Sequence, residues 1–261
     1  MIKTLVNKVY NDTETETNKV ETIKFQAFIV CISAAICITL DEYFGKREFM
    51  FDFLHHVGLH QLADSYADII KDRLFDLSIW VGNIVVFYGI IPLLIIKFVF
   101  KDKFSNYGLG IKGAIKDYKI YLLLIGIMIP IVFAVSFTES FQHKYPFYKI
   151  QEGEGFYPRF LCWELLYLLQ FFAIEFFFRG FMLHGNKKRF GFYSILVMTI
   201  PYCMIHFGKP LPETLAAIIA GVVLGVLSLK SNSIWLGVAI HFSVAITMDF
   251  CSLWQNGLLF K

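Results

Sequence analysis

The chain has 261 residues, of which 57% are hydrophobic, 18% are aromatic and only 17% are charged, and its formal net charge is +3. Soluble domains average ~45–50% apolar and ~25% charged residues, so this composition excludes disordered, collagen-like and disulfide-scaffold chains and indicates a membrane protein. The small, scattered excess of basic residues does not suggest a nucleic-acid partner.

Seven stretches of the sequence are long and apolar enough to cross a bilayer. A spanning helix needs ~20 mostly apolar residues, and it must satisfy its own backbone hydrogen bonds because lipid offers none. The stretches are residues 25–40, 77–96, 120–138, 160–178, 190–208, 214–229 and 231–248. The sequence therefore predicts an all-α, polytopic membrane protein with seven or eight transmembrane helices.

These stretches divide the chain into three parts. Residues 1–24 are predicted to be a polar tail, residues 25–159 a set of N-terminal membrane helices, and residues 160–250 a helical core. Within the second part, the acidic and aromatic segment 41–76 is predicted to be a helix that lies partly in the membrane interface.

The segment 41–76 contains three histidines. His56 and His60 would share one face of a helix, and His55 lies beside them. A metal site at this pair is one alternative, and a solvated loop that happens to carry histidines is the simpler interpretation.

Lysine and arginine in short loops predict the orientation of the chain. Positive residues gather in the loop 97–119, at the end of the loop 179–189 and at Lys230, and these loops fall on one side of the membrane together with the N-terminal tail. Cytoplasmic loops carry this excess. We expect an integral membrane protein with the N-terminus inside and the C-terminus outside.

Ionisable residues inside the predicted spans are confined to the second half of the chain. They are Glu164, Glu175, Arg179, His206 and His241. A charged residue at mid-helix costs ~2.5–3.5 kcal/mol on insertion scales, so such residues are functional candidates by default. If the protein has a chemical function, we expect it in residues 160–249.

The spacing of these residues suggests what they do. Glu175 and Arg179 are four residues apart, which predicts a buried ion pair that supports folding. Glu164 lies three helical turns before Glu175 on the same stripe. At ~1.5 Å per residue, Glu175, His206 and His241 reach similar depths from three helices. A carboxylate and two imidazoles can activate a water molecule, with the imidazoles holding a metal ion or stabilising charge.

Four segments resemble the motifs of a known family. Ile174–Gly180 (IEFFFRG) resembles an EExxxRG motif, Tyr202–His206 an FxxxH motif, and His241–Ala245 an HxxxN motif. Asn106–Gly110 is similar to a Gly-Leu stretch before the third span. Their order and spacing resemble the CAAX protease and bacteriocin-processing (CPBP, or Abi) family of intramembrane proteases, which includes the type II CAAX prenyl proteases.

This resemblance implies a protease of seven or eight helices that cleaves a membrane-associated or lipidated peptide within or next to the bilayer. In such proteins the first glutamate of EExxxR activates water, while the histidines and the asparagine assist and the oxyanion is stabilised. The resemblance thus points to Glu175, His206 and His241 as catalytic, with Arg179 in support. Bacterial relatives are linked to bacteriocin maturation and self-immunity. A zinc or other divalent ion at His206 and His241 is an alternative.

Two positions depart from the family pattern. Ile174 stands where the family has its first glutamate, and Ala245 replaces the asparagine. Loss of an oxyanion donor costs ~10²–10³ in rate, and loss of the general base ~10²–10⁴. Another carboxylate would have to serve, in the order of preference Glu175, then Glu213 in the proline-bearing turn after His206, then Glu164.

Three hypotheses follow. The first is a peptidase with a displaced catalytic carboxylate, which the retention of both histidines favours. The second is a protease-fold membrane protein without activity, acting as an immunity protein, chaperone or scaffold, which the residues at 174 and 245 favour. The third is a transporter or lipid-handling protein, since ionisable residues in spans also mark ion pathways. The sequence shows no internal repeat, which counts against the third.

Overall fold

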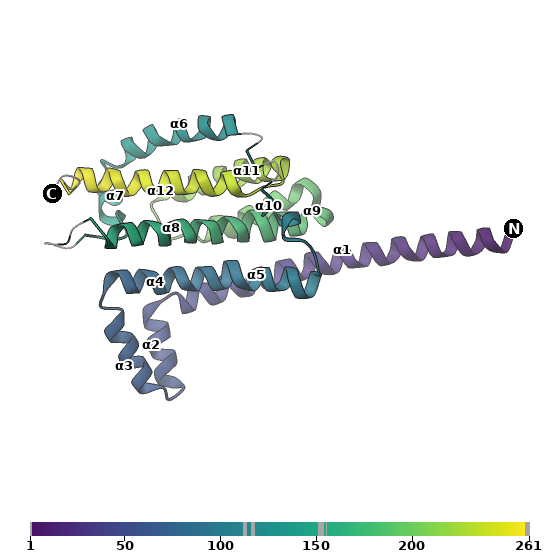
Figure 1. Ribbon diagram of the computed structural model, residues 1–261, viewed down its shortest axis with the longest axis horizontal. Helices are drawn as coiled ribbons and strands as arrows, with labels where there is room; N and C mark the ends of the chain where they lie inside the picture. Colours follow the sequence, from purple (N-terminus) through teal and green to yellow (C-terminus); the bar gives the residue numbers. More distant parts are fainter. Residues whose placement is uncertain (1, 112–113, 116–117, 151–153, 155, 259–261) are drawn as a thin grey trace.

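The computed structural model describes residues 2–111, 114–115, 118–150, 154 and 156–258, with side chains described from residue 20 onward. Throughout these residues the regular structure is helical and no strand occurs, so the predicted all-α class is confirmed. The long helices lie side by side in a bundle, and the two termini lie at opposite ends of it (Figure 1).

Six helical stretches in the described residues are long and apolar enough to cross a membrane. Every predicted span overlaps one of them, and the predicted spans 160–178 and 190–208 both fall in the longest. The protein is therefore a multi-pass membrane protein. The stretches are Val20–Phe44, Arg73–Phe100, Tyr118–Val135, Arg159–Met204, Leu211–Ser231 and Trp235–Gln255.

The stretch Arg159–Met204 reverses direction within itself. The rings of Phe178 and Tyr202 are 5.2 Å apart, whereas an unbroken helix would separate these residues by ~36 Å. The reversal falls at Gly191, whose φ of +54° suits glycine. The elements in order are α8 (Arg159–Glu175), the π-helix η4 (Phe176–His184), α9 (Gly185–Phe190), the short 3₁₀ turn η5 (Gly191–Tyr193) and α10 (Ser194–Met204).

The helix α10 is shorter than the predicted span. It ends at Met204, and residues 205–209 form a turn before α11 (Leu211–Ser231) begins. The prediction that His206 lies within a spanning helix at 190–208 is therefore wrong. Pro210 and Pro212 favour a new helix start here, because proline lacks the N–H that a helix interior uses and fits well in a first turn.

The N-terminal part of the chain supplies three spans. The first belongs to α1 (Ile2–Phe44), an unbroken helix that includes the predicted polar tail and projects past the bundle (Figure 1). The second combines α4 (Arg73–Ile84), η1 (Val85–Ile90), α5 (Ile91–Leu94) and η2 (Ile95–Phe100). After the short turn η3 (Phe104–Tyr107) comes α6 (Tyr118–Val135), then the short α7 (Glu139–Lys144). The last span of the chain is α12 (Trp235–Gln255). Lys112 and Lys116 of the predicted basic loop lie outside the described residues.

The π-helix η4 is the centre of the bundle. All of its nine residues are buried, and Phe176, Phe177, Phe178 and Phe181 are fully enclosed in the main apolar cluster. Such complete burial requires neighbours on every side, and α1, α10 and α11 all contact η4. The chemistry-bearing residues that follow Phe176 are thus held in a rigid, apolar setting.

Small residues let α10 and α11 approach closely. Ala217, Gly221 and Gly225 recur every four residues, a pattern typical of close helix packing. A Cβ on Gly221 would lie 2.8 Å from Thr199, and one on Gly225 would lie 3.1 Å from Ile195. The close approach of these helices places Tyr202 and the turn beyond it against the core.

Segment 41–76 forms a helical hairpin instead of one helix. Its arms are α2 (Arg47–His56) and α3 (His60–Ile69), and the turn between them contains Gly58 with a φ of +81°. Because the helix is interrupted, the prediction that His56 and His60 share a helical face is wrong. Instead His55 and His60 meet across the turn, with their Nδ1 atoms 2.9 Å apart.

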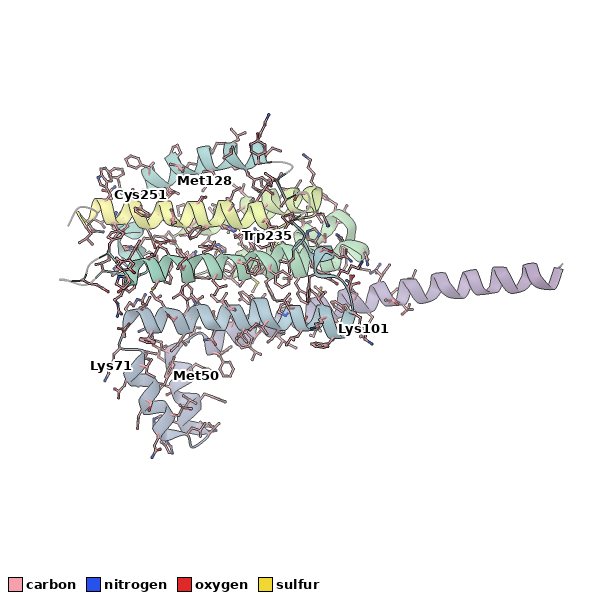
Figure 2. All side chains as sticks on the ribbon, in the orientation of Figure 1. Met50, Lys71, Lys101, Met128, Trp235 and Cys251 are labelled. Atoms are coloured by element: carbon pink, nitrogen blue, oxygen red, sulfur yellow. The ribbon has the colours of Figure 1, made fainter. Side chains whose placement is uncertain are left out.

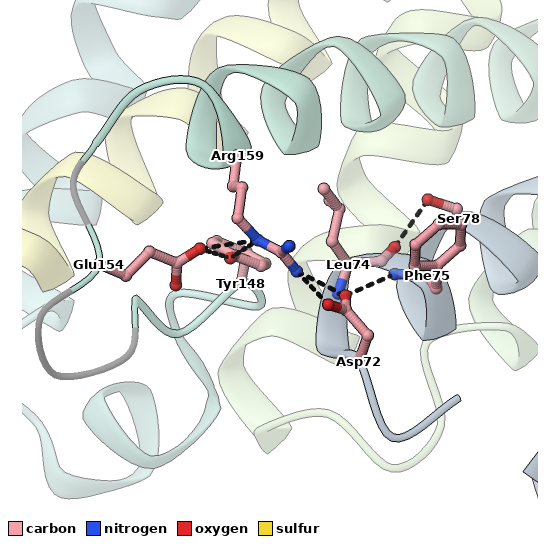
Figure 3. Close-up of polar contacts among 7 residues, drawn as sticks. All are labelled: Asp72, Leu74, Phe75, Ser78, Tyr148, Glu154 and Arg159. Atoms are coloured by element: carbon pink, nitrogen blue, oxygen red, sulfur yellow. Dashed lines mark hydrogen bonds and ion pairs between the residues drawn. The ribbon is translucent and has the colours of Figure 1, made fainter. Parts of the chain in front are cut away.

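Polar contacts join the beginnings of α4 and α8 at one end of the bundle (Figure 3). Asp72 caps α4 by accepting hydrogen bonds from the backbone N–H groups of Leu74 and Phe75. Both oxygens of the same carboxylate accept hydrogen bonds from Arg159 Nη2, at 2.5 Å to Oδ1 and 2.6 Å to Oδ2. Arg159 Nε lies 2.8 Å from Glu154. Two spans that are distant in the sequence therefore share one terminal ion pair.

This ion pair predicts a pH dependence. The bond from Arg159 holds the pKa of Asp72 below its usual range, so the charged carboxylate stabilises the fold above ~pH 4 and the stabilisation is lost as the pH falls through the lowered pKa. We expect Asp72→Asn to lower the Tm in detergent at pH 6, and the gap from the parent chain to narrow steadily towards pH 3. A gap that stays constant over this range would show that the charge of Asp72 contributes nothing.

Candidate functional site

Glu175 and Arg179 form the ion pair that their spacing predicts. Glu175 is the last residue of α8 and Arg179 lies one turn on, in η4. Arg179 Nη1 lies 2.9 Å from Glu175 Oε1, and both residues are 0% exposed. The distance is that of an ion pair, although the angles are outside those of a hydrogen bond. Attraction between two buried opposite charges therefore holds the contact.

His241 joins this pair from α12. Its Nδ1 lies 2.7 Å from the same Oε1 of Glu175, and its Nε2 lies 3.0 Å from the hydroxyl of Tyr202. A lone pair facing a carboxylate at this distance would be repelled, so Nδ1 carries the proton. With the proton on Nδ1, Nε2 accepts the Tyr202 O–H. Both ring nitrogens of His241 are thus in use within the protein.

Tyr202 connects the members of the site, and reasoning from the sequence missed it. Its ring lies beneath the Arg179 guanidinium, with 3.9 Å from Cζ to the ring centroid. Its hydroxyl bonds His241, and its backbone carbonyl accepts a hydrogen bond from His206 Nδ1 at 2.9 Å. A tyrosine inside an apolar span was the available signal, since a buried phenol needs a hydrogen-bond partner.

Of the two histidines of the site, His206 is the one whose second nitrogen makes no hydrogen bond to another described residue. Because a carbonyl only accepts, the bond to Tyr202 fixes the proton on Nδ1 and leaves the lone pair on Nε2. The imidazole packs edge-on against the Tyr202 ring, 4.8 Å between centroids, and that ring also lies 6.2 Å from the imidazole of His241. The structure therefore brings Glu175, His206 and His241 around one tyrosine.

Gly237 makes room for the carboxylate of Glu175. A Cβ on this residue of α12 would lie 2.5 Å from Glu175 Oε2, closer than real Cβ atoms come. Oε1 of Glu175 contacts Arg179 and the Nδ1 of His241, and Oε2 faces the backbone of α12. The carboxylate is enclosed on both sides.

We predict that Gly237→Ala destabilises the protein by about 1–3 kcal/mol, the cost of inserting one carbon into a well-packed core. Differential scanning calorimetry of the purified protein in detergent measures this loss of stability. The matched control is Gly126→Ala on α6, where a Cβ meets nothing within 4 Å and alanine should be neutral or stabilising. Equal effects at the two positions would mean that the carboxylate is not confined.

Glu213, which the sequence analysis considered as a substitute base, is hydrogen-bonded to residues outside the Glu175 site. It lies in the first turn of α11, where Lys209 donates to Oε1 at 2.6 Å and the Tyr145 hydroxyl donates at 3.1 and 3.2 Å. Burial and the charge of Glu213 raise the pKa of Tyr145, so the phenol stays protonated and able to donate. Glu213 ties the turn after His206 to the loop after α7.

Glu164 belongs to a different region of the bundle. It is 5% exposed, and neither carboxyl oxygen has a hydrogen-bond partner among the described residues. The neighbouring Trp163 donates its Nε1 to Asp249 Oδ2 at 3.0 Å. Asp249 is buried, and the sequence analysis overlooked it because it follows the last predicted span by one residue. The shared stripe does not bring Glu164 into contact with Glu175.

The two positions that depart from the family motifs are both apolar in their surroundings. Ile174 is partly buried and packs against the main apolar cluster. Ala245 is 2% exposed and belongs to a second apolar cluster, which contains Trp163 and Tyr167. No polar group takes the place of the family's glutamate or asparagine at these positions.

The described residues do not fit a metal site. Among them no group of three or more histidine, cysteine, aspartate or glutamate side chains is arranged to hold an ion. His241, one of the two histidines considered as ligands, already uses Nδ1 on Glu175 and Nε2 on Tyr202.

These features define a polytopic helical membrane protein with a buried ionic centre. Residues 157–247 match the family model of the type II CAAX prenyl endopeptidase Rce1-like proteins. This match confirms the resemblance to CAAX-type intramembrane proteases for the part of the chain that carries Glu175, Arg179, His206 and His241. Asn106–Gly110 lies outside the matched residues. Neither the curated proteins nor the solved structures contain a match to this chain.

Proposed function

We propose that the protein binds a lipidated, membrane-embedded peptide in its helical core and does not hydrolyse it. The matched family is described by its action on CAAX prenyl peptides, which supports a substrate of this class. The enclosure of Glu175 is the observation that supports the absence of hydrolysis. A general base must come within hydrogen-bond reach of a water molecule. In Glu175, one carboxylate oxygen contacts Arg179 and His241, and the other packs against the backbone at Gly237.

The contacts of His241 also explain why a non-hydrolytic protein would keep its histidines. The Nδ1 proton of His241 stabilises the charge of Glu175, and His206 fastens the turn after α10 to Tyr202. Removing either leaves a buried polar group without its partner, which costs ~1–3 kcal/mol. Retention of the histidines therefore follows from folding alone.

A second candidate function is supported by His206. Its Nε2 keeps a free lone pair, so this imidazole could accept a proton from water and support slow peptide hydrolysis. In that case activity depends on His206 and not on Glu213 or Glu164.

One experiment separates the two functions. A farnesylated peptide with a photoreactive group and a quenched fluorophore is added to the protein in nanodiscs, with the unlipidated peptide as control. We expect saturable crosslinking of the lipidated peptide, which mass spectrometry finds intact. Hydrolysis that disappears in His206→Ala would establish the second candidate. Crosslinking that is equal for both peptides would overturn lipidated-peptide binding.

We further propose, from the basic loops, that the N-terminus is inside and the C-terminus outside. The opposite positions of the two termini in Figure 1 support this arrangement. Protease protection of an epitope tag at each end in sealed vesicles tests it.

A further inference from the structure

The hairpin of α2 and α3 is attached to the membrane surface at both ends. The span of α1 ends at Phe44 and the next span begins at Arg73, so residues 45–72 start and finish at the same face of the bilayer. The two arms pack on each other, with Leu54 and Ala63 as their buried residues. Figure 1 shows both arms running across the direction of the spans. The hairpin therefore extends along the membrane plane.

The outer arm α3 has two exposed faces of opposite character. Leu62 and Ile69 are seven residues apart and 54% and 49% exposed, and Leu59, just before the helix, is 49% exposed on the same side. Asp64 and Asp68, whose side chains are both 74% exposed, lie about 100–160° around the helix from Leu62 and Ile69. An apolar stripe and an acidic stripe thus run along different parts of the exposed half of α3, and no other described residue buries them.

The inner arm α2 repeats this arrangement. Phe53, and Val57 at the C-cap of α2, are 40% and 48% exposed, while the exposed Glu48 and Asp52 lie about 100–180° around the helix from them. Figure 2 shows Lys71, just after α3, at the end of the hairpin that joins α4. On both arms the exposed acidic residues are thus separated around the helix from the exposed apolar ones.

The apolar stripes continue the lipid-facing surface of the bundle. Tyr43 at the end of α1 and Phe75 at the start of α4 are 51% and 58% exposed, and they flank the hairpin at the level where the spans leave the membrane. Both residues belong to helices that are long and apolar enough to cross the membrane, so lipid is expected beside them. The same lipid surface reaches the hairpin without interruption.

We infer that the α2–α3 hairpin is an interfacial anchor that inserts its apolar stripe among the lipid headgroups beside the bundle. Interfacial helices of this kind bury their apolar face ~5–10 Å into the headgroup and acyl boundary. Residues 45–72 contain three basic residues against five acidic ones, a net charge of −2, so apolar burial and not attraction to anionic lipid holds the hairpin in place. The anchor lies outside the residues that match the protease family and is independent of the proposed function.

Site-directed spin labelling of the full chain tests the anchor. Labels are placed at Leu62→Cys and Ile69→Cys, with Asp64→Cys and Asp68→Cys as matched positions on the acidic stripe, after replacing the five native cysteines with alanine. For each label we measure the ratio of its accessibility to oxygen over its accessibility to a water-soluble nickel chelate. In neutral lipid vesicles we expect this ratio to be several-fold higher at Leu62 and Ile69 than at Asp64 and Asp68. Adding anionic lipid should leave this ratio unchanged.

Other results would overturn the anchor. Equal nickel access at all four positions would place the hairpin in water, and exclusion of both reagents at Leu62 would show that a second protein copy covers the stripe. If the cysteine-free chain does not fold, Leu62→Trp and Asp64→Trp in the native background give the same comparison. Brominated lipids should then quench only the first added tryptophan.

Discussion

Replacing Arg179 with alanine should destabilise the protein by about 3–5 kcal/mol, the cost of breaking a buried ion pair from one side. The change leaves the Glu175 carboxylate in an apolar core with only His241 beside it, and it also removes the guanidinium from the Tyr202 ring. Unfolding of the purified variant in mixed micelles measures the loss as a lower Tm and a lower free energy of unfolding.

A double variant separates the charge from the packing. Glu175→Gln combined with Arg179→Met removes both charges and keeps the volume, so we expect it to be considerably more stable than Arg179→Ala alone. If Arg179→Ala unfolds at the same temperature as the parent chain, Glu175 is neutral in the folded protein, and the contact with Arg179 is not an ion pair.

The second large effect is expected from Ile174→Glu. This substitution places a carboxylate where the matched family's motif has its water-activating glutamate, about 100° around the helix from Glu175. A positioned general base contributes ~10²–10⁴ in rate, so hydrolysis of a quenched lipidated peptide should rise clearly above the parent chain. The matched control is Ile174→Gln, because glutamine has the same size as the introduced glutamate and carries no charge.

The structure also sets the order in which the family residues should be restored. Ala245 lies among Trp163 and Tyr167, where an asparagine amide would have to find a partner in an apolar cluster. Ile174→Glu should therefore be tested alone before Ala245→Asn is added. An active parent chain whose activity falls in the Ile174→Glu variant would instead indicate a peptidase that already uses a displaced carboxylate.

The sequence was sufficient to predict the fold class and one contact of the site. Long apolar stretches can only be spanning helices in a bilayer, and Glu175 and Arg179 meet because four residues make one helical turn. These inferences depend on local periodicity alone. To predict that Glu175 and His241 meet, the depth of each residue along its helix was needed as well. The rise per residue gave this depth correctly because both residues lie within regular helices.

Other parts of the site depend on tertiary packing that leaves no periodic signal. Gly237 contributes only the absence of a side chain, and the roles of Tyr202 depend on its ring, hydroxyl and carbonyl meeting three different elements. The position of His206 depends on where α10 stops, and apolar residues on both sides of Met204 concealed that end. Hydropathy determines which segments enter the membrane but not where a helix inside it terminates.

The pairing of Glu175 with Arg179 on one helix has a consequence for how the chain enters the membrane. Both charges belong to the same continuous helical segment, so they can neutralise each other as soon as that segment forms, before α10 and α12 have been synthesised. His241 and Tyr202 reach the pair later, when the following helices arrive. This buried ion pair thus becomes compatible with lipid during synthesis, without waiting for the partners that complete it.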